Sequence, residues 1–168
     1  MRVLGVDCGG EYTGYGVVEQ DDAGILRHVC SGAVRLAARE ALELRLKAIS
    51  DALEQIITLH HPDLVAIEDV FYAVNVKSAL KLGHVRGVAM LAAAQAKLSV
   101  VAYSPLSIKS AVVGYGRAEK SQVQLMVARL LNLAEPPEPP DVADALAIAI
   151  CHLHTAATLQ RQSEAGGG

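Results

Sequence analysis

Residues 3–20, VLGVDCGGEYTGYGVVEQ, decide the fold. An apolar run ends at Asp7, two glycines follow as a turn, and residues 13–18 have the pattern of a second strand. Residues 25–34 predict a third strand after a polar turn at 21–24. Because the connections are too short for parallel crossovers, these three strands are predicted to form an antiparallel meander.

The rest of the chain alternates helical and strand patterns, which indicates an α/β layered fold. Apolar residues repeat at helical spacing over 38–60, and Pro62 ends that helix. The next strand, 64–68, follows a helical crossover and should lie parallel to the first strand. Further elements are predicted as a helix at 76–97, a strand at 100–103, and helices at 104–113, 120–131 and 141–154. We expect one domain over residues 1–154 and a disordered tail over 155–168.

Composition indicates an ordinary intracellular domain. The chain has 168 residues, 52% of them hydrophobic, which is enough for a sizeable core. Cys8, Cys30 and Cys151 lack a paired spacing and are interpreted as free thiols in a reducing cytosol. The N-terminus has a strand pattern rather than a signal peptide. The longest apolar stretch, 88–102, is too short and too polar to span a bilayer, so a cytoplasmic protein without a membrane segment is expected.

Four acidic residues should converge on one point. Asp7 and Glu68 end two strands predicted to lie side by side, and active sites favour the carboxyl ends of parallel strands. Asp141 and Asp144 are three residues apart near the start of the last helix, so they share one face. Alone, Asp141 is better explained as a helix cap. Together, four such carboxylates would repel each other strongly unless cations lay between them.

Oxygen-only ligands of this kind select Mg²⁺ or Mn²⁺ rather than zinc. Two such ions about 4 Å apart can activate a water molecule and stabilise the leaving oxygen when a phosphodiester is cleaved. The acids therefore predict metal-dependent phosphoryl transfer. His152 and His154 lie roughly 12–15 Å further along the helix, so they are interpreted as packing or helix-end residues.

Basic residues are concentrated in the middle of a chain whose net charge is −3. Residues 77–129 contain eight basic residues and a single acid, whereas the remainder of the chain has a balance of −10. This distribution suits a metal-using enzyme that acts on a polyanion, although chance clustering on a solvated helix would look the same. The basic residues are Lys77, Lys81, Arg86, Lys97, Lys109, Arg117, Lys120 and Arg129.

Motifs along the whole chain resemble the RuvC family of bacterial Holliday junction resolvases, within the RNase H-like superfamily. The matching segments run in order from residue 2 to about residue 154. They are Gly5-Val6-Asp7-Cys8-Gly9, Thr13-Gly14-Tyr15-Gly16, Ala66-Ile67-Glu68-Asp69-Val70-Phe71, Ser78-Ala79-Leu80-Lys81-Leu82-Gly83, Val112-Val113-Gly114, Ala118-Glu119-Lys120-Ser121-Gln122-Val123-Gln124 and Asp141-Val142-Ala143-Asp144-Ala145-Leu146-Ala147.

The resemblance implies an RNase H-like, five-stranded mixed sheet, with three antiparallel strands and then parallel additions, flanked by helices. It also implies a homodimer that binds a four-way DNA junction and nicks two opposing strands, leaving 5′-phosphate and 3′-hydroxyl ends. The four acids would be the catalytic residues and would hold two Mg²⁺ ions, with Mn²⁺ as a substitute. The RuvA–RuvB branch-migration complex is an expected partner.

The resemblance assigns DNA contacts as well. Lys109 and Lys120 match basic residues near the cleaved backbone, and Phe71 matches a position that stacks on a base at the junction centre. The basic span adds further expected DNA-binding residues, which are Lys77, Lys81 and Arg86.

The chain departs from the family pattern at two positions. Cys8 replaces the usual proline and places a thiol beside the expected metal site, and Asp69 replaces the usual glutamine. Strand alternation should turn Asp69 away from the side of Glu68, so Asp69 need not be a ligand. Gly83 and Gly87 share one helix face and would permit close packing, either on the sheet or against a second subunit.

Two other functions share some of these features. An actin-like or sugar-kinase ATPase also begins with a strand, an Asp-x-Gly motif and a turn. However, such an enzyme needs a second similar domain, so this chain could only be a fragment of one. A non-catalytic junction-binding dimer would use the acids for stability alone.

Overall fold

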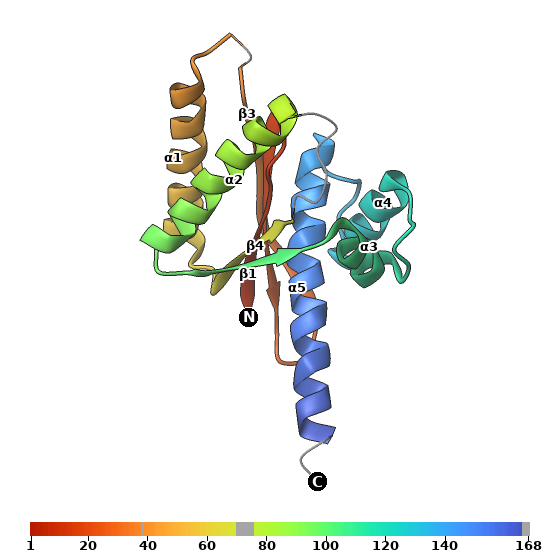
Figure 1. The fold of residues 1–168 in the computed structure, drawn as a ribbon. Coiled ribbons are helices and arrows are strands. Elements are labelled where there is room, and N and C mark those ends of the chain that lie inside the picture. The colour runs from red at the N-terminus through yellow and green to blue at the C-terminus, as the bar shows by residue number, and fades with distance from the viewer. Residues whose placement is uncertain (38, 70–75, 166–168) are drawn as a thin grey trace.

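A five-stranded mixed sheet forms the centre of the protein in the computed structural model, which describes residues 1–37, 39–69 and 76–165 (Figure 1). The strands are β1 (Arg2–Asp7), β2 (Tyr12–Gln20), β3 (Leu26–Arg35), β4 (Leu64–Glu68) and β5 (Ser99–Tyr103). Their order in the sheet is β3-β2-β1-β4-β5. β1 pairs antiparallel with β2 and parallel with β4, while β2–β3 is antiparallel and β4–β5 parallel. The predicted fold class is confirmed.

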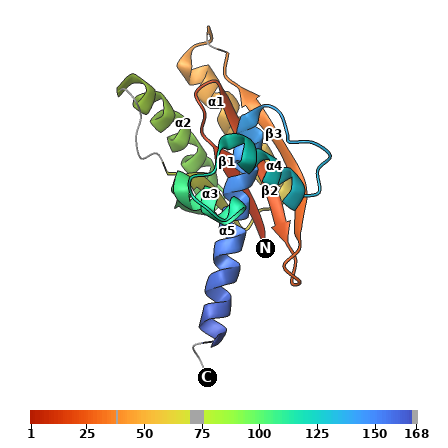
Figure 2. The same ribbon diagram turned by 90° about the vertical axis from the view of Figure 1, so that its right-hand side faces the viewer.

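Helices cover both faces of the sheet (Figure 2). They are α1 (Leu42–His60), α2 (Val76–Gln95), α3 (Pro105–Val113), α4 (Lys120–Leu130) and α5 (Pro140–Ala165). Alternation along the strands divides the core into two parts. Leu4, Val6 and Ile67 pack with α1 and α2, whereas Val3 and Ala66 pack with α3, α4 and α5.

α5 lies unusually close to the sheet because glycines face it. A Cβ atom at Gly5 would overlap the carbonyl oxygen of Ala145, and one at Gly14 would overlap the carbonyl oxygen of Asp141. Only a residue without a side chain fits at either position. The glycines in β1 and β2 therefore set the distance between the strands and the helix that carries two of the four acids.

Most element boundaries lie within two residues of those predicted from the sequence. The start of α1 and the end of α5 differ from the prediction. α1 begins at Leu42 rather than at residue 38, because the chain after β3 first packs Leu36 into the core. α5 does not end at His154 as predicted but continues to Ala165. The structure thus has helix over residues 155–165, where the sequence predicted a disordered tail.

Two side-chain hydrogen bonds lie within the extension of α5. The hydroxyl groups of Thr155 and Thr158 donate hydrogen bonds to the carbonyl oxygens of Cys151 and His154, one turn earlier. The alanine, glutamine and arginine residues that follow have good helix propensity. By length and composition, residues 140–163 could also cross a membrane. However, side chains such as Leu146, Ile150 and Leu153 are fully buried against the sheet, as in the core helix of a globular domain.

Candidate active site

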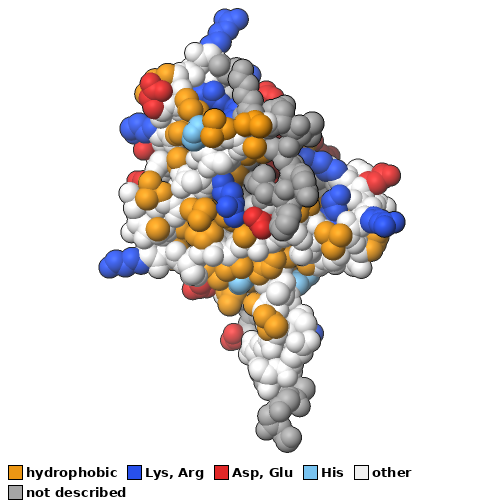
Figure 3. Space-filling view, viewed as in Figure 1, with side chains coloured by type: hydrophobic (Ala, Val, Ile, Leu, Met, Phe, Trp, Pro, Cys, Tyr) orange, Lys and Arg blue, Asp and Glu red, His pale blue; other side chains and the backbone are white. Residues whose placement is uncertain are grey.

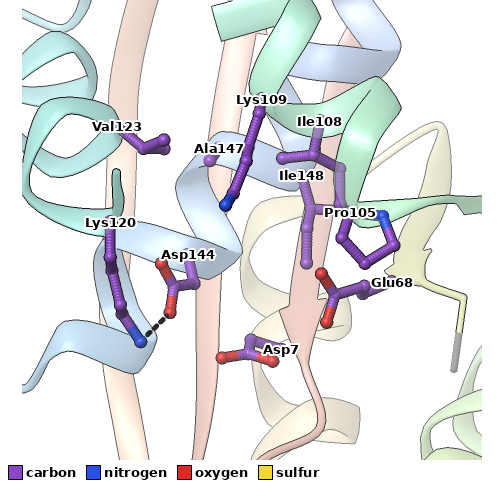
Figure 4. Close-up of a pocket in the computed structure, with 10 residues that line it drawn as sticks. All are labelled: Asp7, Glu68, Pro105, Ile108, Lys109, Lys120, Val123, Asp144, Ala147 and Ile148. Carbon is purple, nitrogen blue, oxygen red and sulfur yellow. Dashed lines mark ion pairs between the residues drawn. The ribbon is translucent and has the colours of Figure 1, made fainter. Parts of the chain in front are cut away.

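Three of the four predicted acids line one cavity of about 360 Å³ (Figure 4). Asp7 and Glu68 are the last residues of neighbouring parallel strands, and alternation places both on the face that α5 covers. Asp144 approaches them from the first turns of α5. Figure 4 shows the three carboxylates directed toward one space, so the predicted convergence is confirmed for these residues.

Asp141 lies beside this cavity rather than in its lining. Its Oδ1 atom is 2.6 Å from the position that a Cβ atom on Gly9 would occupy, so Asp141 lies against the turn after β1. Its negative charge nevertheless acts on Asp7. The fourth acid thus belongs to the same electrostatic cluster, although its side chain approaches from the side of the turn.

Two lysines supply positive charge to the cavity. Lys109 of α3 extends its amine into the space above the carboxylates (Figure 4). Lys120 is the first residue of α4, where a capping box between Glu119 and Gln122 fixes the helix start. The Lys120 Nζ atom is 2.6 Å from Asp144 Oδ2. Although burial opposes the charged amine, the hydrogen bond and charge of Asp144 raise the pKa of Lys120.

Burial and mutual repulsion make the ionised form of these carboxylates unfavourable. Burial first, and then the charges of Asp144, Glu68 and Asp141, raise the pKa of Asp7 from 3.8 to about 7. Burial followed by the charge of Asp144 also raises the pKa of Glu68. The ion pair with Lys120 compensates only part of this repulsion. A divalent cation would compensate the rest, since hard cations prefer carboxylate oxygens.

The donor set therefore fits a divalent metal in its chemistry. No group of three or more His, Cys, Asp or Glu side chains within residues 1–37, 39–69 and 76–165 is arranged to hold an ion as it stands. Binding would require the carboxylates to draw together, and the Lys120–Asp144 contact would have to adjust.

In metal-free protein, the free energy of unfolding is expected to fall as the pH rises from about 4 to about 7. Asp7 binds its proton more tightly in the folded protein, with a pKa of about 7, than in the unfolded chain, with 3.8. Over this interval the folded state holds more protons, so raising the pH costs stability, by up to about 4 kcal/mol. Asp7→Asn removes this contribution and should stabilise the protein near neutral pH.

Urea unfolding in EDTA at several pH values measures this effect. The difference between wild type and Asp7→Asn isolates Asp7 from other titrating groups, and added Mg²⁺ should reduce it. The same pH dependence in both proteins would show that Asp7 is not held among repelling carboxylates.

The other predicted DNA contacts differ in their surroundings. Lys81 lies near the turn after β1, with its Nζ atom 3.6 Å from the position that a Cβ atom on Gly10 would occupy. Arg86 is partly buried, and its Nη2 atom lies 3.4 Å from Oδ1 of Asp69. Lys77 lies in the first turn of α2, but its side chain is outside the described structure, as is the whole of Phe71.

The two family departures leave the carboxylate cluster intact. Burial, followed by the charge of Asp7, raises the pKa of the Cys8 thiol to about 12, so the thiol stays protonated. Cys8 packs with the core between the sheet and α1–α2, on the face opposite Asp7. Asp69 is directed toward Arg86, in agreement with its expected orientation away from the ligands.

The two histidines of α5 bind other elements rather than the carboxylates. The Tyr103 hydroxyl and His152 Nδ1 are 2.8 Å apart, and His154 Nδ1 is 2.9 Å from the carbonyl oxygen of Ala111. These contacts join α5 to β5 and α3, which agrees with their interpretation as packing residues.

Sequence reasoning missed the apolar wall of the cavity. Pro105 and Ile108 of α3 and Val123 of α4 line it together with the acids. The sequence predicted helices over 104–113 and 120–131 but could not show that these helices border the site.

Comparisons with known proteins agree with this geometry. The sequence model described as crossover junction endodeoxyribonuclease RuvC matches residues 3–152. The chain is 67% identical to the crossover junction endodeoxyribonuclease RuvC of Koribacter versatilis, over 96% of this chain and 97% of that protein.

Solved structures show the same relationship. Thermus thermophilus RuvC in complex with a Holliday junction substrate is 35% identical, with a TM-score of 0.89, covering 94% of this chain and 96% of that one. The yeast mitochondrial Holliday junction resolvase is 16% identical with a TM-score of 0.68, covering 95% of this chain and 80% of that one, and shares the fold.

Proposed function

Because the chain belongs to the RuvC family of crossover junction endodeoxyribonucleases, we propose that it resolves four-way DNA junctions by divalent-metal-dependent nicking. The observation that carries this proposal is the convergence of Asp7, Glu68 and Asp144 with Lys109 and Lys120 in one cavity. The structural similarity to a relative solved with a Holliday junction supports the choice of substrate. The cell compartment of such an enzyme would be the cytoplasm, where its DNA lies.

Each residue has a role that follows from its place. Asp7, Glu68, Asp141 and Asp144 would hold two Mg²⁺ ions, with Mn²⁺ as a substitute. When bound, these ions activate water and stabilise the leaving oxygen of a phosphodiester. Burial of Asp7 keeps bulk water from screening its charge. The products would be 5′-phosphate and 3′-hydroxyl ends.

The lysines would act on the DNA itself. The Lys109 amine, directed into the cavity, can pair with a phosphate oxygen of the strand to be cut. Lys120 pairs with Asp144 and offsets its negative charge. If Asp144 bound a metal ion instead, the Lys120 amine would be free to contact the same phosphate. DNA and metal would therefore replace an ion pair that now lies within the protein.

An exposed apolar face on α2 supports a homodimer. Leu80 is 61% exposed, Met90 and Leu91 are also exposed, and Figure 3 shows hydrophobic side chains on the face that α2 covers in Figure 1. Cβ atoms at Gly83 and Gly87 would meet no atom within 4 Å, so these glycines do not pack on the sheet. Of the two explanations for them, contact with a second subunit is favoured. Paired nicks on opposing strands require such a dimer, and RuvA–RuvB would be its partner at the junction.

Leu80→Glu is expected to convert the dimer to monomers, because each subunit would bury a charge in the same apolar interface. Light scattering after size exclusion measures the mass, and Leu59→Glu, an equally exposed leucine of α1, is the matched control. A Leu80→Glu protein that keeps the dimer mass would exclude this face of α2 as the interface.

Cleavage of a synthetic four-way junction tests the proposed function. Wild type should nick two opposing strands in Mg²⁺ and none in EDTA, while a linear duplex of the same sequence should remain intact. Binding without cleavage would favour the non-catalytic junction-binding dimer. Stabilisation by ATP rather than by junction DNA would favour the actin-like ATPase.

A further inference from the structure

A second hollow lies beside the turn that follows β1. Its lining includes Arg35, Arg39 and Lys81, together with Glu11, and we call it the basic hollow. The two-glycine turn separates it from the acids. Asp141 lies against Gly9, while the Lys81 amine lies over Gly10, the next residue. The basic hollow and Asp141 therefore lie on the same two-glycine turn.

The rim of the basic hollow is held in place by the sheet. Arg35 is the last residue of β3 and pairs with Tyr12 at the start of β2. The amide of Leu36 donates a hydrogen bond of 2.8 Å to the carbonyl oxygen of Glu11. The Leu36 side chain is only 4% exposed, so it anchors the segment after β3 in the core. Arg35 thus stands at a fixed position relative to the turn and to Asp7.

The charge of the basic hollow is not neutralised by the protein. Three cations face one carboxylate, and within the described residues none of these four side chains forms an ion pair. Arg35, Arg39 and Glu11 are exposed, and Lys81 is partly exposed. By contrast, the exposed cations Arg27 and Lys47 pair with Asp21 and Asp51. Unpaired cations in a concave surface raise the local concentration of anions.

We propose that the basic hollow binds the phosphodiester backbone of the DNA strand that continues from the cleavage site, an inference that rests on the proposed nuclease function. A strand whose phosphate lies at Asp7 and Asp141 can continue in one direction across the Gly9–Gly10 turn, toward the basic hollow. DNA carries one phosphate per about 3.4 Å of axis on each strand. The phosphates next to the cleavage site would therefore lie over the Gly9–Gly10 turn and the basic hollow. Arg35 and Arg39 then hold the strand in register without contributing to the chemistry.

Salt dependence of junction binding tests this proposal, because each lost phosphate contact reduces the slope of log affinity against log salt by about 0.9. The test variant is Arg35→Gln/Arg39→Gln. The matched control, Lys97→Gln/Arg161→Gln, removes the same charge. Lys97 precedes β5, and Arg161 is near the end of α5, so both lie far from the carboxyl ends of the parallel strands. Binding is measured in Ca²⁺ without cleavage, and single-turnover cleavage is measured in Mg²⁺ at saturating protein.

The slope should fall by about 2 for Arg35→Gln/Arg39→Gln and remain near the wild-type value for the control. The cleavage rate constant at saturation should stay near wild type for both, since neither pair touches the reacting phosphate. Equal slopes in the two variants, with wild type still cutting the junction, would overturn the basic hollow as a DNA site. Failure of wild type to cut the junction would instead overturn the proposed function.

Discussion

Asp7→Asn is expected to cleave a four-way junction at least about 100-fold more slowly than wild type, while binding the junction as tightly or more tightly. Replacing even an outer partner of a metal ligand typically costs 10–100-fold, and Asp7 lies at the centre of the carboxylate cluster. The same change removes a negative charge close to the DNA phosphates, which favours binding. Single-turnover cleavage and gel-shift binding measure the two effects separately.

Asp22→Asn is the matched control for this variant. Asp22 is exposed in the turn between β2 and β3, at the opposite end of β1 from Asp7, so its loss should change neither quantity. If Asp7→Asn cleaved the junction as fast as wild type under the same conditions, the carboxylates would not form the metal site.

Gly5→Ala is expected to lower the free energy of unfolding by at least about 3 kcal/mol and to impair cleavage as well. The added methyl group would overlap the carbonyl oxygen of Ala145 and lie 2.9 Å from the amide nitrogen of Ala149. Backbone atoms cannot turn aside as a flexible side chain can, so α5 must shift from the sheet. That shift would carry Asp141 and Asp144 away from Asp7.

Urea unfolding provides the measurement, and Gly10→Ala is the control. Its methyl group would meet only the end of the Lys81 side chain, at 3.6 Å, so stability should change by less than about 0.5 kcal/mol. Similar stability losses in both variants would argue against close packing of α5 as the reason for Gly5.

The sheet could be predicted in detail because clear turns separate its first three strands and helical patterns separate the last two. Residues 64–68 were predicted as a strand with the observed bounds, since Pro62 ends the preceding helix and the run is apolar up to Glu68. The extent of α5 could not be predicted in this way. Its last eleven residues carry little apolar periodicity, so their helical state follows from residue propensity rather than from a pattern of buried side chains.

The acids of the site could be predicted because each stands at the end of a strand or the start of a helix, where topology determines position. Charged residues on helices were harder to assign. Arg86 belongs to the basic span, yet its pairing with Asp69 depends on how α2 packs beside β4. Arg35 and Arg39 lie outside the basic span and line the basic hollow only because β3 ends beside the turn after β1.

Direct counting of bound cations tests the central claim, that these carboxylates form one divalent metal site. The electron paramagnetic resonance signal of free Mn²⁺ falls when the ion binds protein, so a titration gives the number of bound ions. Wild type and Asp22→Asn should bind Mn²⁺ saturably and to the same extent. Asp7→Asn should lose this binding. Equal Mn²⁺ binding by wild type and Asp7→Asn, or no binding by wild type, would contradict the claim.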